Sequence, residues 1–258
     1  MPISLTLPTP SPAMSVPPYP YPTTNTELIA AHALIKHFEG GYFAQTLALE
    51  SAVPTTPSPA NPHVPKSAAL GGREQYDSGP GAELLSGKTA PRPEDGQDVK
   101  TDATQIYYLL TPDSHRGKMH MNLHSTFHIH HAGRALYTLI RPPSPSEPGA
   151  GPLVKKVVVG PNVWRGEVKQ LFVPGGWWKA SEIPEEDLEL VKSKGAEDGD
   201  VKERVGCLIS EVVVPGWNPD QHQFIDEQKL KAMWEGKDGW EEYAKYIRAP
   251  DGLEYPEK

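Results

Sequence analysis

Histidines gather in one short stretch of this sequence. Six of its ten histidines lie between positions 115 and 131, where the chain reads HMNLHSTFHIHHAG from His120 onward. Imidazole titrates near neutral pH and binds transition metals, so such a stretch can move protons or hold a metal ion. Alternate side chains of a strand share a face, which predicts Thr126, His128 and His130 on one side. Polar side chains facing a barrel interior are costly unless they are bonded, and we therefore expect a pocket here.

The elements that position these residues read as short strands. They are rich in β-branched and aromatic residues and are separated by Gly, Pro, Asp or Asn. Regular short strands with turn signals favour an all-β barrel or sandwich. We expect His120 and Asn122 on a strand that forms a hairpin with the histidine strand. The paired glycines Gly40 and Gly41 allow a sharp turn, and an extended segment is expected after them. The predicted strands of the core are Gln105–Thr111, Gly117–Leu123, Ser125–His131, Ala135–Ile140, Leu153–Gly160, Lys169–Val173, Trp177–Glu182 and Val205–Val214.

Helices are expected only at the edges of this β domain. A short helix is predicted over about Thr26–His37, with Thr26 as its N-cap and an apolar face. His32 and His37 in that segment are expected to be partly exposed. Near the C-terminus, helical turns are expected over Asp226–Trp234 and Gly239–Ile247.

The composition divides the chain into one domain with polar additions. With 29 prolines and 23 glycines, the chain does not suit a mainly helical protein. Residues 1–24 are expected to form a disordered Pro-rich arm, residues 25–250 a single domain, and residues 251–258 a tail. Two loop insertions are expected within the domain, at about 51–103 and 183–204.

Several segments together resemble the cupin superfamily, specifically the uncharacterised Cupin_5 branch, which is related in fold to the dTDP-4-dehydrorhamnose epimerases. Their order and spacing carry the resemblance, over residues 39–46 and about 104–230. It implies a double-stranded β-helix, the jelly-roll barrel of cupins, with a few short peripheral helices. The segments are EGGYF from Glu39, TQIYYLLT from Thr104, the histidine stretch from His120, VPGGWW from Val173, and the strand that runs from Val205 to Trp217.

The resemblance also implies where a metal ion would bind, and the chain departs from the family there. Metal-binding cupins usually place two histidines and a glutamate in the first motif and a third histidine in the second. The glutamate corresponds to Thr126 and the third histidine to Lys179, which repels a cation while protonated. We therefore expect no cofactor. The alternative is a divalent transition metal at His120, His128 and His130, because neutral imidazoles suit Zn, Fe, Cu or Ni.

Acid–base chemistry is the activity that the resemblance favours. Epimerase-like cupins are described as using a histidine base and a tyrosine acid, which here implies His120 or His128 as base. Tyr108 or Tyr107 would be the acid, and strand alternation puts only one of them inside. Lys179 would stabilise a developing oxyanion. The residues expected to bind the substrate are Tyr42, Gln45, Asn122, Thr126, His130, Trp178 and Lys179.

Three classes of function follow. The prediction is a metal-independent isomerase, epimerase or cyclase that acts on a small polar or aromatic metabolite, with His120, His128 and Tyr108 as catalytic residues. The alternatives are a metal-dependent oxygenase or lyase that uses the histidine cluster, and a ligand-binding cupin without catalysis. Fold alone does not decide among them. No Gly-rich phosphate-binding loop supports a nucleotide cofactor.

Two residues stand out in the last predicted strand. Cys207 is the only cysteine, so it cannot form an internal disulfide, and it is expected to be a buried structural thiol. Glu211 interrupts an apolar run. Its carboxylate lies either on the solvent face or paired inside the barrel, and the solvent face is the expectation.

Charge and hydropathy limit the kinds of partner and the cellular location that are expected. The net charge is −8 and no basic stripe is present, so nucleic acid is not an expected partner. No run of about 18 apolar residues exists, so no membrane span is expected. Residues 1–35 carry a single charge, Glu27, unlike a signal or transit peptide. With a single cysteine and no signal-like N-terminus, the chain is expected to be cytoplasmic. A homodimer is expected because related cupins commonly pair through their barrel sheets. The expected partner is a small-molecule substrate.

Overall fold

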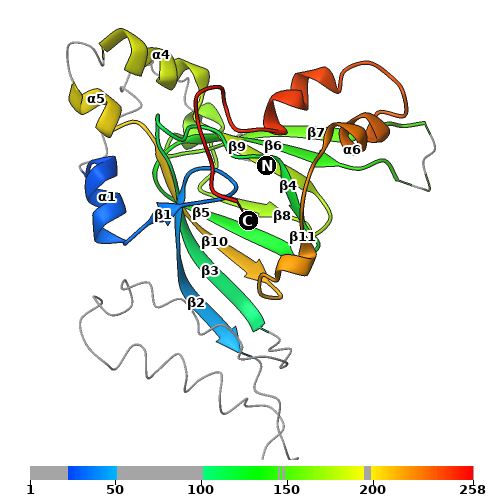
Figure 1. Ribbon diagram of the computed structural model, residues 1–258, viewed down its shortest axis with the longest axis horizontal. Coiled ribbons are helices and arrows are strands. Elements are labelled where there is room, and N and C mark those ends of the chain that lie inside the picture. Colours follow the sequence, from blue (N-terminus) through cyan, green and yellow to red (C-terminus); the bar gives the residue numbers. More distant parts are fainter. Residues whose placement is uncertain (1–22, 51–100, 145, 147–148, 195–198, 258) are drawn as a thin grey trace, which may run out of the picture.

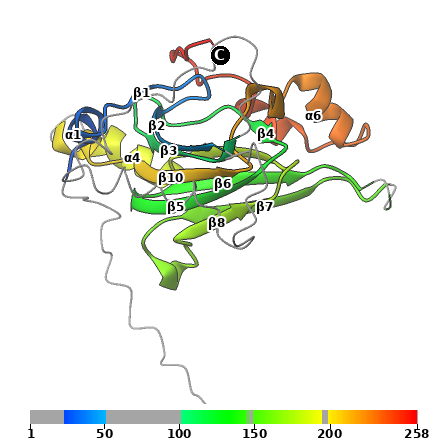
Figure 2. The same ribbon diagram turned by 90° about the horizontal axis from the view of Figure 1, so that it is seen from below.

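The computed structural model describes residues 23–50, 101–144, 146, 149–194 and 199–257 (Figure 1). Its strands form two antiparallel sheets, one of six strands in the order β1-β2-β3-β10-β5-β8 and one of five strands in the order β11-β4-β9-β6-β7. Figure 2 shows the strands running between α1 and α4 at one end of the molecule and α6 at the other. The all-β jelly-roll barrel predicted from the sequence is confirmed.

Every strand predicted for the core is present, and each agrees with its prediction to within four residues. The extended segment expected after Gly41 is β2, whereas β1 and β11 were not among the predictions. The six-stranded sheet contains β1 (Ile35–Lys36), β2 (Tyr42–Glu50), β3 (Thr101–Leu110), β5 (Ser125–Gly133), β8 (Gln170–Val173) and β10 (Cys207–Val214). The five-stranded sheet contains β4 (His120–Asn122), β6 (Ala135–Arg141), β7 (Leu153–Val159), β9 (Trp178–Glu182) and β11 (His222–Phe224).

The hairpin expected between the two histidine strands is not formed. Strand β4 pairs with β9 and β11 in the five-stranded sheet, whereas β5 pairs with β10 and β8 in the six-stranded sheet. The turn at Leu123 and His124 therefore carries the chain from one sheet to the other instead of folding it back. As a result, His120 and His128 approach the barrel interior from opposite sheets.

The first helix begins earlier and ends sooner than predicted. Helix α1 spans Asn25–Ala31, and its N-cap is Thr24, not Thr26. The Thr24 side chain accepts a hydrogen bond from the Glu27 amide while the Glu27 carboxylate accepts one from the Thr24 amide, which forms a capping box. His37 lies beyond the helix and is buried, so the expectation that it is partly exposed was wrong.

The remaining helices follow the predictions more closely. The second insertion contains α4 (Glu185–Lys194) and α5 (Gly199–Glu203), and the C-terminal region contains α6 (Glu227–Met233). The first insertion and the N-terminal arm fall largely outside the described residues, although residues 101–103 belong to β3. Within the described part of the chain, no helix has the length and apolar character needed to cross a bilayer. The 3-10 helices are η1 (Val163–Arg165), η2 (Pro219–Gln221) and η3 (Glu241–Tyr246).

Strand alternation gives β9 two buried faces of opposite character. Trp178 and Ala180 belong to an apolar cluster that includes Leu230 of α6, on the outer face of the five-stranded sheet. Lys179 and Ser181, the residues between and after them, line a cavity inside the barrel. Because side chains alternate between the two faces of a strand, the five residues of β9 serve both core packing and the polar cavity.

Candidate functional site

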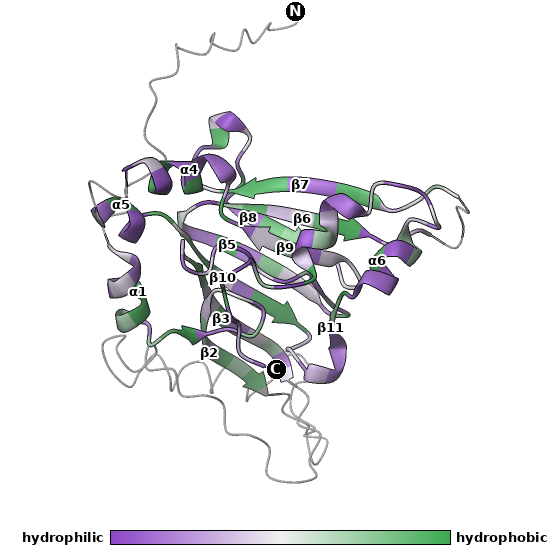
Figure 3. Ribbon diagram, turned by 45° about the horizontal axis from the view of Figure 1, so that its top comes forward, coloured by the Kyte–Doolittle hydropathy of each residue, from purple (hydrophilic) through white to green (hydrophobic). Residues whose placement is uncertain are grey.

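A small polar cavity lies between the two sheets. Its volume is about 10 Å³, close to the space that one water molecule needs. Figure 3 shows β5, which carries most of the histidine stretch, as a largely hydrophilic strand within the six-stranded sheet. The cavity is lined by Glu39, Tyr108, Gly117, His120, His128, Tyr137, Lys179, Ala180, Ser181 and Glu211.

His128 is the most deeply buried imidazole of the cavity, with 1% of its surface exposed. Its Nε2 lies 3.3 Å from Lys179 Nζ and 3.1 Å from Thr126 Oγ1, and its Nδ1 lies 3.4 Å from the Tyr137 hydroxyl. An ammonium group can only donate, so Nε2 accepts and Nδ1 carries the proton. Burial, and then the charge of Lys179, lower the pKa of His128 well below its usual value. The imidazole is therefore neutral at pH 7.

Lys179 forms a buried ion pair with Glu211. The ammonium is 3% and the carboxylate 11% exposed, and a second carboxylate oxygen lies 3.6 Å from His128 Nδ1. The expectation that Glu211 faces solvent was wrong. On β10 it points into the barrel, and the lysine opposite compensates its charge, which a buried carboxylate requires.

The two tyrosines of β3 point to opposite faces. Tyr108 lines the cavity, whereas Tyr107 packs edge to face with His131, with ring centroids 5.7 Å apart. Tyr137 of β6 also lines the cavity. Burial raises the pKa of both Tyr108 and Tyr137 well above the usual value, and the charges of nearby carboxylates add to this. Both hydroxyls therefore keep their protons at neutral pH and can donate hydrogen bonds.

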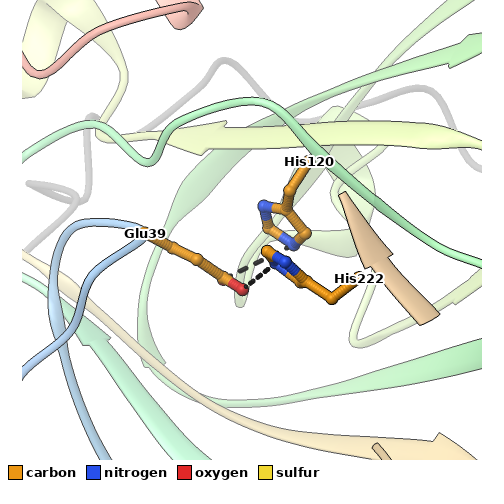
Figure 4. A group of neighbouring side chains, drawn as sticks. All are labelled: Glu39, His120 and His222. Carbon is orange, nitrogen blue, oxygen red and sulfur yellow. Dashed lines mark hydrogen bonds and ion pairs between the residues drawn. The ribbon is translucent and has the colours of Figure 1, made fainter. Parts of the chain in front are cut away.

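Three imidazoles surround the carboxylate of Glu39, which precedes β2. Figure 4 shows two of them, His120 and His222. His222 Nε2 donates a hydrogen bond to Oε1 at 2.7 Å. His120 Nε2 and His37 Nδ1 lie 3.4 and 3.5 Å from Oε2. Burial alone would raise the pKa of Glu39, but the imidazoles of His120 and His37 and the hydrogen bond from His222 hold that pKa well below its usual range.

His120 is fixed by a backbone contact on its other side. Its Nδ1 lies 3.0 Å from the carbonyl oxygen of Lys118. Because a carbonyl only accepts, Nδ1 carries the proton and Nε2 presents a lone pair toward Glu39. The His120 ring stacks on that of His222, with centroids 5.1 Å apart. Burial lowers the pKa of His120 to about 4, against the opposing effect of Glu39.

Six of the seven residues expected to bind the substrate do not line the cavity. Tyr42 and Gln45 lie half-buried on β2, and Asn122 is buried at the end of β4. His130 is half-buried and bonds a backbone carbonyl at the end of β5. Trp178 packs in the apolar cluster under α6. Of the other expected residues, His120, His128, Tyr108 and Lys179 do line the cavity, and Thr126 contacts two of them.

Sequence reasoning did not single out four residues of this region. Glu39 was read only as part of a glycine turn, and Tyr137 only as part of a strand. His37 and His222 come from the two ends of the domain, so no local spacing links them to the histidine stretch. The cavity residues outside that stretch are recognisable only when strand alternation is combined with sheet pairing.

The residues at the metal positions of the cupin resemblance do not fit a metal ion. Lys179 Nζ lies 3.4 Å from Thr126 Oγ1 and 3.3 Å from His128 Nε2. Its ammonium places a positive charge among the very groups that would surround a metal, and Glu211 balances that charge. Thr126 also offers a neutral hydroxyl in place of the glutamate. No catalytic step is therefore derived through a metal at these positions.

Comparison with known proteins agrees with this architecture. The Cupin_5 family model, described as cupin superfamily (DUF985), matches residues 26–225. The chain is 32% identical over 209 residues to the uncharacterized protein YML079W of Saccharomyces cerevisiae, an alignment that covers 80% of this chain and 78% of the yeast protein.

Two solved structures show the same fold. A hypothetical protein from Leishmania major superposes with a TM-score of 0.51 at 19% identity, over 87% of this chain and 97% of that protein. Protein SO0799 from Shewanella oneidensis superposes with a TM-score of 0.52 at 15% identity, over 90% and 99%. The family match covers most of the domain, and the chain therefore belongs to the Cupin_5 family of the cupin superfamily.

Proposed function

We propose that this protein is an enzyme that isomerises, epimerises or cyclises a small polar metabolite by acid–base chemistry at His128. The observation that carries the proposal is a neutral, buried imidazole held between Lys179 and Tyr137 in a closed cavity. Buried ionisable groups stabilise a fold no better than apolar side chains of similar volume. Their concentration here supports a functional role, because perturbed titratable groups gather at active sites.

The side chains divide into complementary roles. His128 Nε2 takes the proton from a substrate C–H next to a carbonyl, and the bonding pair moves into the carbonyl to form an enolate. Lys179 donates to the developing oxyanion. As the ammonium turns from the imidazole to the substrate, one cause of the low His128 pKa is removed and the base becomes stronger. Tyr108 gives its hydroxyl proton to the enolate carbon, which forms the new C–H bond as the carbonyl returns. Solvent then takes the proton from His128 and gives one to Tyr108. Tyr137 positions the imidazole through Nδ1.

A larger groove supports binding of a metabolite. The inner cavity has room for about one water molecule, so the body of a substrate needs another space. A groove of about 630 Å³, within the usual range for ligand sites, is lined by His37, Gly41, Asp113 and Tyr255, among others. His37 accepts a hydrogen bond from the Glu39 amide, and Glu39 lines the inner cavity. We place the body of the substrate in this groove.

Exchange of substrate hydrogens with solvent tests the proposal. The full chain is incubated in D₂O with a panel of small oxo acids, keto sugars and nucleotide sugars, and NMR detects deuterium at carbon. We expect one class to exchange, and His128→Gln to slow the exchange about 10²–10⁴-fold. His131→Gln, which changes the outer face of the same strand, is the matched control and should exchange at the wild-type rate.

The alternatives give different results in the same assay. A compound that raises the melting temperature without exchanging its hydrogens would indicate a ligand-binding cupin. Exchange that disappears after chelation and returns with added metal would indicate metal-dependent chemistry, the other alternative. Exchange of the same rate in His128→Gln would remove His128 from the mechanism.

A homodimer and a cytoplasmic location belong to the same proposal. Phe127 and Phe172 form an exposed aromatic pair on the outer face of the six-stranded sheet, 45% and 51% exposed, which supports pairing through that sheet. Light scattering should give twice the chain mass of 28.3 kDa. A monomeric mass would contradict the dimer, and recovery in a membrane or secreted fraction would contradict the location.

A further inference from the structure

The cluster around Glu39 has a feature that hydrogen bonds alone do not explain. His120 Nε2 presents a lone pair, because its Nδ1 proton is donated to the Lys118 carbonyl at 3.0 Å. That lone pair lies 3.4 Å from Oε2 of Glu39, which is also an acceptor. Two acceptors that face each other in a buried site need either a proton or a metal ion between them.

A second imidazole adds to the same mismatch. His37 Nδ1 accepts a hydrogen bond from the Glu39 amide at 3.3 Å, so it too presents a lone pair. It lies 3.5 Å from the same carboxylate oxygen. Two imidazole nitrogens that carry lone pairs thus lie within 3.5 Å of Oε2.

The spacing of the cluster suits a metal ion. One ligand atom each from Glu39, His120 and His222 lie within 4.8 Å of one another. The three residues are 9%, 7% and 4% exposed. Two imidazole nitrogens and one carboxylate oxygen form a donor set that binds zinc and iron in proteins, with further coordination positions left open. His222 Nε2 would lose the proton that it donates to Glu39 when the ion binds. The bond from His120 Nδ1 to a carbonyl is the outer contact that metal-bound histidines usually make.

We propose that Glu39, His120 and His222 bind a divalent first-row transition metal ion such as Zn²⁺. This set shares only His120 with the metal positions of the cupin resemblance and with the His120, His128 and His130 alternative. In the described residues His128 and His130 are not part of any such cluster. The site goes beyond the proposed function, and either proposal can fail while the other holds.

The ligands come from three separate parts of the chain, as Figure 4 shows. Glu39 lies in the turn between β1 and β2, His120 on β4 and His222 on β11. Strands β4 and β11 are adjacent, and Asn122 pairs with His222. An ion here would join the N-terminal turn to the C-terminal edge of the five-stranded sheet. Glu39 and His120 also line the inner cavity, so the ion would border the space beside His128.

Direct metal titration tests the site. The full chain is treated with a chelator, transferred to metal-free buffer and titrated with Zn²⁺ by calorimetry and with Co²⁺ by visible absorption. We expect one ion per chain, a cobalt d–d band and a higher melting temperature with Zn²⁺. Glu39→Gln and His222→Gln should each weaken binding about 100-fold or more, since even residues outside the ligand shell cost 10–100-fold.

Matched variants distinguish a metal site from a purely hydrogen-bonded cluster. His131→Gln should bind Zn²⁺ like the wild type. If Glu39→Gln does not fold, the cobalt spectrum of His222→Gln and its response to Zn²⁺ in thermal unfolding decide the question. Less than about 0.2 ion per chain in the wild type would show that a proton, not a metal, joins the carboxylate and the imidazole, and would overturn the proposal. Loss of binding only in His128→Gln or His130→Gln would overturn it in favour of the alternative set.

Discussion

The two faces of the five-stranded sheet are both buried, yet they are built from opposite kinds of side chain. On the outer face, Trp178 packs with Leu230 and Tyr246 in an apolar cluster under α6 and η3. On the inner face, the neighbouring Lys179 is paired with Glu211 and contacts His128. Both groups exclude water, but only the outer one gains free energy from doing so.

The difference indicates that the two faces of a single strand serve different purposes, stability on the outer face and a polar cavity on the inner face. Full burial of a large apolar side chain stabilises a fold by about 1.5–3 kcal/mol. A buried ion pair roughly balances its desolvation cost, and losing one partner is expensive. The outer cluster therefore supplies stability that allows the inner cavity to remain polar. Four experiments test this comparison.

The largest effect is expected inside the cavity, from Lys179→Met. The change leaves the Glu211 carboxylate buried without its partner and should lower the free energy of unfolding by about 3–5 kcal/mol. Combining it with Glu211→Leu should restore stability to within about 1 kcal/mol of wild type. Urea unfolding measures both variants. If the double variant were no more stable than the single one, the pair would be a source of stability, and the contrast between the faces would be wrong.

The outer cluster should respond differently to Leu230→Ala. Leu230 is fully buried, and its truncation creates a cavity that costs about 3 kcal/mol. No second substitution at a charged residue should restore the lost free energy of unfolding. At temperatures where the variant is folded, the exchange of substrate hydrogens with solvent should keep its wild-type rate. A loss of exchange in the folded variant would show that the two faces are coupled.

A smaller effect concerns pH. The pKa of His128 is lowered in the folded state from its usual 6.5. Below pH 6.5 the unfolded chain therefore binds a proton at His128 that the native protein does not bind. Stability should therefore fall as the pH drops below 6.5. In His128→Asn the slope between pH 6 and pH 5 should be smaller by up to about 1.4 kcal/mol per pH unit. Equal slopes in chemical unfolding at several pH values would mean that His128 is charged in the native state.

The smallest effect is expected from Phe127→Thr. Phe127 neighbours His128 in sequence but faces outward and is 45% exposed. The free energy of unfolding should change by about 0.5 kcal/mol or less at low protein concentration. A concentration-dependent loss of stability, seen together with a lower mass in light scattering, would place this side chain in the expected dimer interface.

The fold was predictable because its signals are local. Short strands with turn residues between them gave nearly all the strands. Trp178 and Lys179 were both expected in the pocket, but they lie on opposite faces of β9 and only Lys179 lines the cavity. The hairpin between His120 and His128 was wrong because a tight turn looks the same whether it joins neighbouring strands or crosses between sheets. Sheet pairing depends on contacts between distant residues, which spacing does not reveal.

The candidate site was only partly predictable for the same reason. The histidine stretch drew attention to His120 and His128, which do line the cavity. Glu211 was expected in solvent because a lone carboxylate is usually exposed, and its partner lies on another strand. Glu39 and His222 are 183 residues apart, and only the closed barrel brings them together. Whether any of these residues act in catalysis stays a prediction.

Lys179 gives the barrel a positive charge that is encoded in the gene. A bound ion must be acquired after synthesis and can be exchanged or removed, whereas an ammonium on a side chain is present in every copy, whatever the supply of trace elements. The positive charge beside His128 should therefore persist in metal-starved cells. Any sensitivity of this protein to metal limitation would arise at Glu39, His120 and His222, on the border of the same cavity.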